Sequence, residues 1–264
     1  MIAEDGGLDE ALASLTRVPR LLVALDFDGT VAPLVEDPAT ARPTPAAREA
    51  VARLAGLPAT SVAYVSGRQL SELGWLTGAD DAVVLVGSHG AETSAGPRDA
   101  FALSAPERRR LDALRQAVAR VHDRFPRARI EQKPAGVGVH VRGLETGLGH
   151  AVFGATRAAV EKVVPEVGAY VIREGKGILE FAVRDVTKAD AIRSLRASTR
   201  ADAVFFAGDD VTDEDGFQAL EGAADVGVKV GEGVSAAPFR VADPAALGAL
   251  VARLAVLRAA WAAA

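Results

Sequence analysis

Two groups of acidic residues, each placed directly after an apolar run, stand out in this chain of 264 residues. Asp26 and Asp28 follow the run Leu21–Leu25, in the segment Asp-Phe-Asp-Gly-Thr. The second group, Gly-Asp-Asp-Val-Thr-Asp-Glu-Asp over 208–215, follows the run 203–206. Residues i and i+2 of a strand point the same way, so both carboxylates face one side if the extension persists. Crowded carboxylates repel one another unless protons or a divalent cation relieve them.

A parallel sheet brings the two acidic groups together at its carboxyl edge, where open α/β sheets bind ligands. The chain has no cysteine and four histidines, so disulfides, thiolate zinc sites and a cysteine nucleophile are excluded. Hard oxygen ligands favour Mg²⁺ over zinc. An isolated Asp-x-Asp is as often a turn or a helix cap, but the second group after a second strand favours a metal-assisted phosphoryl transfer.

The net charge of −5 gives no basic excess that would indicate nucleic acid or an anionic membrane as partner. The first residues carry acids and lack the apolar core of a signal peptide. We expect no stretch to approach the ~18 apolar residues of a membrane span, because Arg253 and Arg258 interrupt the alanine-rich end. A soluble, cytoplasmic protein is therefore expected, with the oligomeric state open and a monomer plausible.

The pattern of apolar runs predicts an α/β fold with a parallel sheet covered on both faces. Helices lie between the strands: Thr44 and Pro45 fit the start of one, Thr187 can cap another, and Thr212 has capping-box spacing to Asp215. Trp75 is expected in the core. The predicted strands of this sheet are 21–26, 61–65, 83–87, 203–207 and 225–230.

The middle of the chain has a different pattern, helix then hairpin, repeated once. Apolar residues at helical spacing precede a hairpin around Pro134-Ala135-Gly136, and a second helix precedes a hairpin around Gly175-Lys176-Gly177. Hairpins build an antiparallel sheet with one open face. We therefore predict a core domain over 1–104 and 184–264, interrupted by an inserted α+β domain over 105–183. The predicted elements of the insert are helices 111–125 and about 150–164, and strands 128–133, 137–142, 169–174 and 178–183.

Four motifs in this order resemble those of the haloacid dehalogenase superfamily of phosphatases: Asp-Phe-Asp-Gly-Thr, Ser66-Gly67-Arg68, Lys188 and the acidic segment 208–215. The resemblance implies a Rossmann-like parallel-sheet core with an inserted cap domain. It implies that Asp26 attacks phosphorus and forms an aspartyl-phosphate. It also implies that Asp28 protonates the leaving oxygen in that first step, and then activates the water that hydrolyses the intermediate.

The same resemblance implies the ligands of metal and phosphate. Mg²⁺ is expected on Asp26, the backbone carbonyl of Asp28 and Asp209, with Asp213 or Asp210 helping directly or through water. The family usually has Lys-Gly where this chain has Lys188-Ala189. The residues expected around the phosphoryl group are Asp26, Gly29, Thr30, Ser66, Gly67, Arg68 and Lys188.

The insert is similar to that of trehalose-6-phosphate phosphatases, where it forms a cap between the second and third motifs. The similarity rests on Gly-Ser-His-Gly-Ala-Glu over 87–92 and on motifs of the insert, and it implies that Glu131, Lys133 and Glu180 hold sugar hydroxyls. Glu131 and Lys133 share one face of their strand, as do His140 and Arg142. A merely solvated polar face is the alternative. The substrate-binding candidates are His89, Glu131, Lys133, His140, Arg142 and Glu180; His89 and Glu92 are also candidates for fixing the loop.

The patterns favour a Mg²⁺-dependent phosphatase that acts on a small molecule rather than on a macromolecule, and the resemblance implies that this small molecule is trehalose 6-phosphate. Sucrose phosphate and mannosyl- or glucosyl-phosphoglycerate remain alternative substrates. Phosphomutase activity is a weaker alternative to phosphatase activity. A catalytically silent sugar-phosphate sensor is the alternative from another class. Asp26, Asp28, Asp209 and Asp213 are all present, which argues against that alternative.

Overall fold

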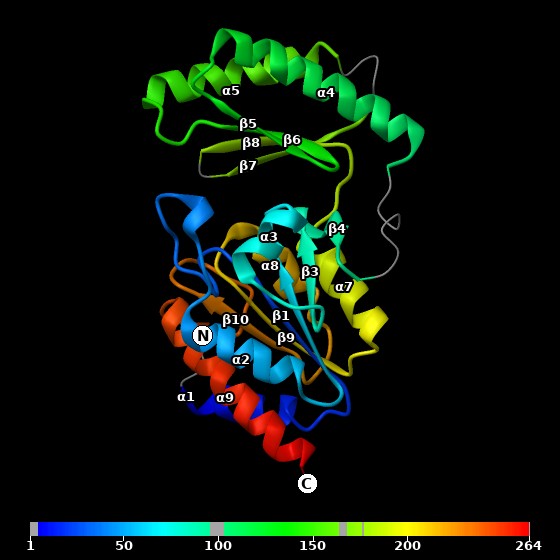
Figure 1. Cartoon of the computed structure of the whole chain (residues 1–264), viewed down its shortest axis with the longest axis vertical. Coiled ribbons are helices and arrows are strands. Elements are labelled where there is room, and N and C mark those ends of the chain that lie inside the picture. Colours follow the sequence, from blue (N-terminus) through cyan, green and yellow to red (C-terminus); the bar gives the residue numbers. More distant parts are fainter. Residues whose placement is uncertain (1–4, 96–102, 164–167, 176, 264) are drawn as a thin grey trace. The chain divides into compact units, whose positions relative to one another are not determined.

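The computed structural model divides the chain into two compact units, which are described separately here. The core unit consists of Met1–Pro97 and Val186–Ala264, and the insert is Arg98–Asp185 (Figure 1). The boundaries expected from the sequence pattern were 104/105 and 183/184. The structure describes residues 5–95, 103–163, 168–175 and 177–263.

The core unit is built on a seven-stranded sheet in the order β11-β10-β9-β1-β2-β3-β4. β1 lies in the middle, with Leu25 opposite Tyr64 of β2 and Ala207 of β9. All strands are parallel except β4, which is antiparallel to β3, so the predicted parallel α/β core is confirmed. The strands are β1 (Leu21–Leu25), β2 (Thr60–Val65), β3 (Val83–Gly87), β4 (Glu92–Thr93), β9 (Ala203–Gly208), β10 (Val226–Val230) and β11 (Phe239–Val241).

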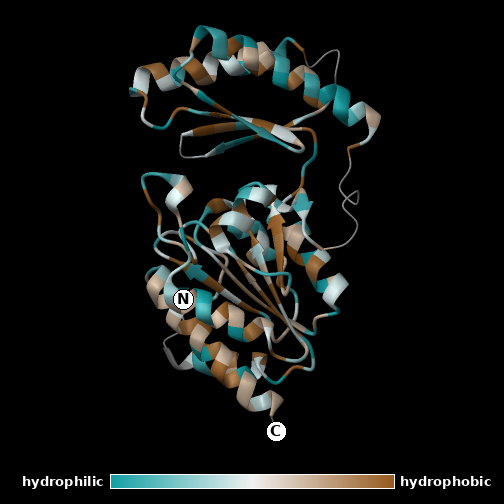
Figure 2. Ribbon diagram, viewed as in Figure 1, coloured by the Kyte–Doolittle hydropathy of each residue, from teal (hydrophilic) through white to brown (hydrophobic). Residues whose placement is uncertain are grey.

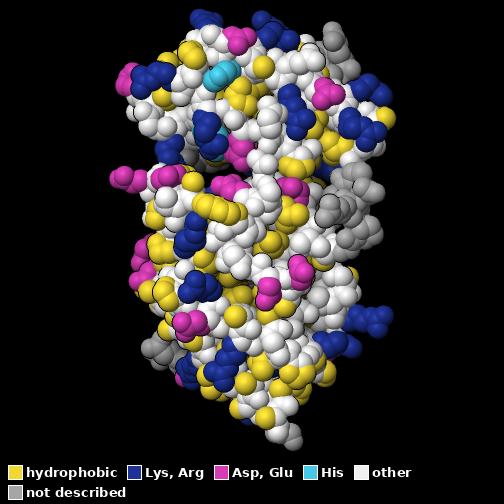
Figure 3. Space-filling model, in the orientation of Figure 1, with side chains coloured by type: hydrophobic (Ala, Val, Ile, Leu, Met, Phe, Trp, Pro, Cys, Tyr) yellow, Lys and Arg dark blue, Asp and Glu magenta, His cyan; other side chains and the backbone are white. Residues whose placement is uncertain are grey.

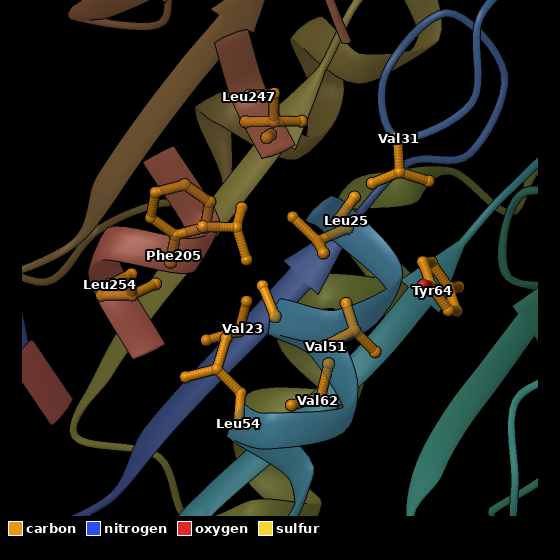
Figure 4. Packing of buried hydrophobic residues seen from close by; sticks show 14 of the residues in the cluster. Val23, Leu25, Val31, Val51, Leu54, Val62, Tyr64, Phe205, Leu247 and Leu254 are labelled. Atoms are coloured by element: carbon orange, nitrogen blue, oxygen red, sulfur yellow. The ribbon is translucent and has the colours of Figure 1, made fainter. Parts of the chain in front are cut away.

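Helices cover both faces of the core sheet, and β1 is therefore buried on both sides. Val23 and Leu25 point toward α2 and α9, together with Phe205 of β9 (Figure 4). Leu22 and Ala24 point the other way, toward the apolar side chains of α7 and α8. The helices of the core unit are α1 (Asp5–Leu15), η1 (Pro38–Thr40), α2 (Pro45–Ala55), α3 (Leu70–Thr77), η2 (Ser88–Gly90), α7 (Lys188–Thr199), α8 (Val211–Gln218) and α9 (Pro244–Ala262).

The starts of these helices follow their capping residues. Thr44 caps α2 by accepting the N–H of Ala47 at 3.3 Å, as predicted. The prediction for α8 was wrong, since its N-cap is Asp210 rather than Thr212. The N–H of Asp210 donates to the carboxylate of Asp213 at 2.9 Å. The capping box therefore begins at Asp210, two residues before the predicted Thr212.

The last helix, α9, has the length and composition of a candidate membrane span, with a mean hydropathy of 1.5 over an 18-residue window. The expectation that no stretch approaches such a span was therefore wrong for this helix. Its many alanines raise the mean despite Arg253 and Arg258. The core helix of a globular protein passes the same test, and the α9 residues Leu247 and Leu254 pack in the core cluster (Figure 4).

The insert is a four-stranded antiparallel sheet in the order β5-β6-β8-β7, with α4 packed against β5 and β6, and α5 packed against α4. Lys176, in the second hairpin turn, lies outside the described residues. Brown apolar and teal polar residues both occur along the strands in Figure 2, as expected for a sheet with one covered face. The elements are α4 (Ala105–Arg124), β5 (Arg129–Lys133), β6 (Gly136–His140), α5 (Thr146–Glu161), β7 (Val171–Gly175) and β8 (Ile178–Ala182).

The two faces of the insert sheet differ in chemistry because strand neighbours alternate. One face carries Val137, Val139, Leu179 and Phe181, all buried. The other face brings Glu131, Gly138, Glu180 and Arg173 into one cross-strand row. The register therefore places three charged side chains in one row with Gly138, which has no side chain.

The two units differ in net charge. In sequence, the insert has 16 lysines and arginines against 11 aspartates and glutamates, a net charge of +5. The core unit has 14 against 24, a net charge of −10. Lysine and arginine side chains are spread over the insert on the face that Figure 3 shows. The whole-chain value of −5 conceals this difference.

Candidate active site

Asp26 lies at the centre of the carboxyl edge of the core sheet, directly after β1. Its N–H donates to the carbonyl of Ala207 in β9 at 3.0 Å, which extends the strand pairing by one residue. The side chain is buried, and its Oδ1 accepts a hydrogen bond from Lys188 Nζ at 2.6 Å. A carboxylate oxygen held by an ammonium group is a suitable nucleophile, because its position is fixed and the ammonium group favours its charged form.

Asp28 has a different environment from Asp26. The extension does not persist, since the carbonyl of Phe27 accepts the N–H groups of Thr30, Val31 and Ala32 in a tight turn. The expectation of two carboxylates on one side of a continuing strand was wrong for this reason. Arg68 instead holds the Asp28 carboxylate with two nitrogens, Nε and Nη2.

Asp213 organises the second acidic group. Its side chain is fully buried, and Oδ2 accepts the N–H groups of Asp209 at 3.0 Å and Asp210 at 2.9 Å. Its Oδ1 accepts from Lys188 Nζ at 2.6 Å. Asp210 itself is exposed. Asp213 therefore fixes the loop after β9 and joins it to Lys188.

Asp209 approaches the β1 turn closely. Its Oδ1 accepts from the hydroxyl of Thr30 at 3.1 Å. A Cβ at Gly29, whose φ is +77°, would lie 2.2 Å from Oδ2 of Asp209. Only glycine allows both that backbone conformation and that approach.

Three carboxylates meet at this edge and form a candidate metal centre. Asp26, Asp209 and Asp213 each offer one oxygen, and these oxygens lie within 4.8 Å of one another. Carboxylate oxygens are the ligands that hard divalent cations prefer. The donor set therefore fits such a cation, with Asp26 and Asp209 the more available ligands because both Asp213 oxygens already accept hydrogen bonds. The side chains of Asp28 and Asp210 are outside this group, and the part expected of the Asp28 carbonyl stays a prediction.

Burial and mutual repulsion shift the pKa values of these carboxyls. Burial, opposed by Lys188, raises the pKa of Asp26 well above its ordinary value. Burial, with the neighbouring Asp213 charge, raises the pKa of Asp209 to about 6. Burial lowers the pKa of Lys188, but the charges of Asp213 and Asp26 outweigh it and the net shift is upward. The Lys188 ammonium group thus does not fully compensate the crowded carboxylates, and a bound cation would stabilise them further.

The Ser66-Gly67-Arg68 motif follows β2 at the same edge. Ser66 is buried and its Oγ accepts the N–H of Arg68 at 3.2 Å. A Cβ at Gly67 would lie 2.6 Å from the His89 ring, so glycine makes room for that histidine. Glu92 accepts from the hydroxyl of Ser88 at 2.7 Å and from the N–H of Leu70 at 3.1 Å. Glu92 thus ties the loop after β3 to the start of α3.

The candidate sugar-binding residues of the insert form two ion pairs on its polar face. Lys133 pairs with Glu180, and both are buried. His140 Nε2 lies 2.6 Å from Glu131 Oε2. Burial raises the pKa of Glu131, but His140 and Lys133 outweigh it and the net shift is downward. Arg142 follows β6 and is exposed, and none of the contacts of the described residues joins it to this cluster.

Two residues of these clusters were missed from the sequence. Arg173 Nη1 lies 3.9 Å from Glu180 Oε1, on the opposite side from Lys133. Lys229 of β10 is buried and donates to the carbonyl of Asp209 at 2.5 Å. A lysine within the buried run Val-Gly-Val-Lys-Val was the available signal, because lysine is almost never fully buried without a partner.

Comparison with known proteins gives a family and a fold. The family model for trehalose-phosphatase matches residues 24–245. The bifunctional trehalose-6-phosphate synthase/phosphatase of Thermoproteus tenax is 32% identical over 262 residues, which is 95% of this chain and 34% of that protein. The trehalose-phosphate phosphatase of Mycobacterium ulcerans is 31% identical over 94% of this chain and 66% of that protein. The chain thus spans between about a third and two thirds of these relatives.

Solved structures with the same fold include a trehalose-6-phosphate phosphatase domain and a protein related to such phosphatases. The C-terminal domain of Candida albicans trehalose-6-phosphate phosphatase has a TM-score of 0.77 at 21% identity, covering 97% of this chain and 98% of that one. A trehalose-6-phosphate phosphatase related protein has a TM-score of 0.70 at 25% identity, covering 89% and 97%. A Bacteroides thetaiotaomicron phosphatase of the haloalkanoate (HAD) superfamily has a TM-score of 0.56 at 16% identity, covering 90% and 95%. The fold is therefore of the HAD type.

Proposed function

Because the chain belongs to the trehalose-phosphatase family, we propose that it hydrolyses trehalose 6-phosphate to trehalose and phosphate through an aspartyl-phosphate on Asp26, with bound Mg²⁺. The observation that carries this proposal is the meeting of Asp26 with Lys188, Asp209 and Asp213 at one edge of the sheet. A nucleophilic carboxylate, an ammonium group and further carboxylates in one buried cluster suit transfer of a dianionic group.

In this proposal Asp26 attacks phosphorus, and Lys188 keeps its Oδ1 in place and favours its charged form against the effect of burial. Asp26 and Asp209 would hold the cation, which supplies positive charge that stabilises the phosphoryl oxygens. Asp28 first donates a proton to the leaving sugar oxygen and then takes one from the attacking water. Its bidentate contact with Arg68 fixes the orientation of the Asp28 carboxyl group for both of these steps.

The polar face of the insert is proposed to bind the sugar. A disaccharide needs several donors and acceptors, and the Lys133–Glu180 and His140–Glu131 pairs offer both kinds. Gly138 lies between Glu131 and Glu180 in the cross-strand row and leaves space beside them. Polar recognition of this type rejects analogues that leave buried groups without partners.

The test is phosphate release from a substrate panel, with Mg²⁺ and with a chelator. The panel contains trehalose 6-phosphate, sucrose 6-phosphate, glucosyl-3-phosphoglycerate and 4-nitrophenyl phosphate. We expect the highest kcat/KM with trehalose 6-phosphate and no turnover with the chelator. We also expect Asp26→Asn to abolish turnover while the protein stays folded. A preference for another ester, or turnover by Asp26→Asn, contradicts the proposal.

A further inference from the structure

Lys229 is a buried charged residue that the proposed chemistry does not use. It belongs to β10, where it lies opposite Gly208, the residue that precedes Asp209. Its side chain is 6% exposed, and Nζ donates to the backbone carbonyl of Asp209 at 2.5 Å. Burial of an ammonium group is costly unless hydrogen bonds and an opposite charge compensate it.

The opposite charge comes from Glu214, one turn into α8. Lys229 Nζ lies 3.6 Å from Glu214 Oε1. The other oxygen, Oε2, accepts the N–H of Ala236 at 2.7 Å and the hydroxyl of Ser235 at 3.2 Å. Lys229 thus connects three segments of the core unit: the loop after β9, the first turn of α8, and the loop between β10 and β11.

Asp209 is held at three points by three residues. Its N–H donates to Asp213, its Oδ1 accepts from Thr30, and its carbonyl accepts from Lys229. The first two bonds fix the amide nitrogen and the side chain. The third fixes the plane of the following peptide, and with it the direction of the Cα–Cβ bond that carries the carboxylate.

We propose that Lys229 is a positioning residue that holds Asp209 in the orientation required to bind the divalent cation; this rests on the proposed function. Lys229 acts through the Asp209 backbone and contacts neither the cation nor the substrate. Groups that orient a metal ligand in this way typically contribute about 10–100-fold to metal affinity.

Electrostatics alone predicts the opposite change in Mg²⁺ affinity when Lys229 is removed. The direction of the measured change therefore distinguishes the two explanations. A positive charge beside a cation site weakens cation binding, and Lys229 also neutralises Glu214. If charge were its only effect, removing Lys229 would tighten Mg²⁺ binding. If Lys229 positions Asp209, removing it weakens Mg²⁺ binding, because the ligand is no longer held.

The experiment is calorimetric titration of the full chain with Mg²⁺ alone, without substrate. We expect Lys229→Met to raise the Kd for Mg²⁺ about tenfold or more, and Lys229→Arg to recover part of the affinity because it keeps donors and charge. In turnover assays, kcat of Lys229→Met should approach the wild-type value at saturating Mg²⁺, with an unchanged KM for the sugar phosphate. An unchanged or tighter Kd in Lys229→Met overturns the proposal.

Arg196→Met is the matched control. Arg196 pairs with the buried Asp225 at 2.6 Å, and Asp225 also accepts the N–H of Val204 at the start of β9. This control breaks an ion pair at the opposite end of the same strands, so it should lower the melting temperature without changing the Kd for Mg²⁺. An equal rise in Kd for Arg196→Met would reduce Lys229 to a general structural role and overturn the proposal.

Two further arms keep the outcome decisive. If Lys229→Met does not fold, Glu214→Gln removes the charge that holds Lys229, and we expect a smaller rise in Kd; no rise overturns the proposal. Wild-type protein that neither binds Mg²⁺ nor releases phosphate refutes the proposed function itself. Wild-type protein that does both, beside a Lys229→Met variant with unchanged Kd, refutes only the role of Lys229.

Discussion

Arg68 holds both carboxylate oxygens of Asp28, with Nε 2.6 Å from Oδ2 and Nη2 2.7 Å from Oδ1. The same guanidinium also donates to Glu72 at 2.5 Å and to the carbonyl of Pro38 at 2.9 Å. Asp28 itself raises the pKa of Arg68, against the effect of burial. The acid/base candidate is thus attached to a second motif 40 residues away.

Arg68→Lys should lower kcat about 10–100-fold, because a lysine cannot form the two-nitrogen contact that orients Asp28. Glu72→Gln keeps that contact and should cost much less. Steady-state kinetics with trehalose 6-phosphate checks both variants. A change confined to KM would mean that Arg68 serves phosphate binding, as the motif resemblance implied, rather than the orientation of Asp28.

Lys188→Met should destabilise the metal-free protein by about 3–5 kcal/mol, since it leaves the buried Asp26 and Asp213 without their cation. Added Mg²⁺ should restore part of the loss. The free energy of unfolding in urea, with and without Mg²⁺, measures this. The control is Arg193→Met, which breaks an exposed pair with Asp190 and should cost only about 0–1 kcal/mol. Equal stabilities of the two variants would contradict the prediction.

Metal binding should release protons at acidic pH. Burial and Asp213 raise the pKa of Asp209 to about 6 from an ordinary 3.8. Protonation of Asp209 therefore stabilises the metal-free folded state relative to the unfolded state. This contribution is complete below pH 3.8 and is lost as pH rises through about 6.

Calorimetry of Mg²⁺ binding in buffers of different ionisation enthalpy tests this sign. At about pH 5.5 we expect net proton release, and at about pH 8 almost none, because the carboxyl is then already ionised. Affinity should rise with pH and level off above about 6. Asp209→Asn should reduce both effects and leave the part that comes from Asp26, whose pKa burial also raises. Heats that do not depend on the buffer at the lower pH would refute the prediction.

Arg258→Met should lower the free energy of unfolding by at least ~3 kcal/mol while kcat stays unchanged. The fully buried guanidinium donates to the carbonyls of Thr16, Val18, Pro19 and Ala59, which would lose their donor. The control on the same helix is Arg253→Met, which breaks an exposed pair with Asp9 and should cost about 0–1 kcal/mol. Chemical denaturation distinguishes the two, and similar losses would contradict the argument.

Glu180→Gln should raise KM for trehalose 6-phosphate about 10–100-fold, through one lost charged hydrogen bond, and hardly affect 4-nitrophenyl phosphate. The control is Glu174→Gln in the neighbouring strand, which loses only an exposed pair with Arg157. The two substrates are assayed side by side on each variant. Equal effects on both substrates would remove the sugar-binding role of Glu180.

The elements that position the site were predictable because they are long and uniform in pattern. β1, β2, β3 and β9 are mainly apolar runs, and β10 is a valine-rich run that contains Lys229, so each was predicted to within about two residues. β4 and β11 contain two and three residues, too few to show a period. They depend on pairing with a strand already in place, which local sequence does not report.

Side-chain environments were less predictable than strands. The partner of Asp28 depends on a turn and on Arg68 in the loop after β2, so the spacing of the aspartates alone misplaced its carboxylate. Lys229 was missed because its partner is a backbone carbonyl: a lysine in a buried run indicates that it has a partner, but no residue type in the sequence identifies that partner. Trp75 was expected in the core, yet it is 63% exposed with the Arg42 guanidinium 4.2 Å from its ring centre. In each case a distant contact outweighs the local pattern.

The central strand β1 pairs with β9, and about 180 residues of chain lie between Leu21 and its neighbour Ala203. A ribosome adding roughly 5–20 residues per second needs on the order of ten to forty seconds to make that length. Throughout this interval β1 lacks one of its two neighbours, so its apolar edge is available to chaperones or to wrong partners. Assembly of the catalytic centre is consequently one of the last events in the biogenesis of the protein.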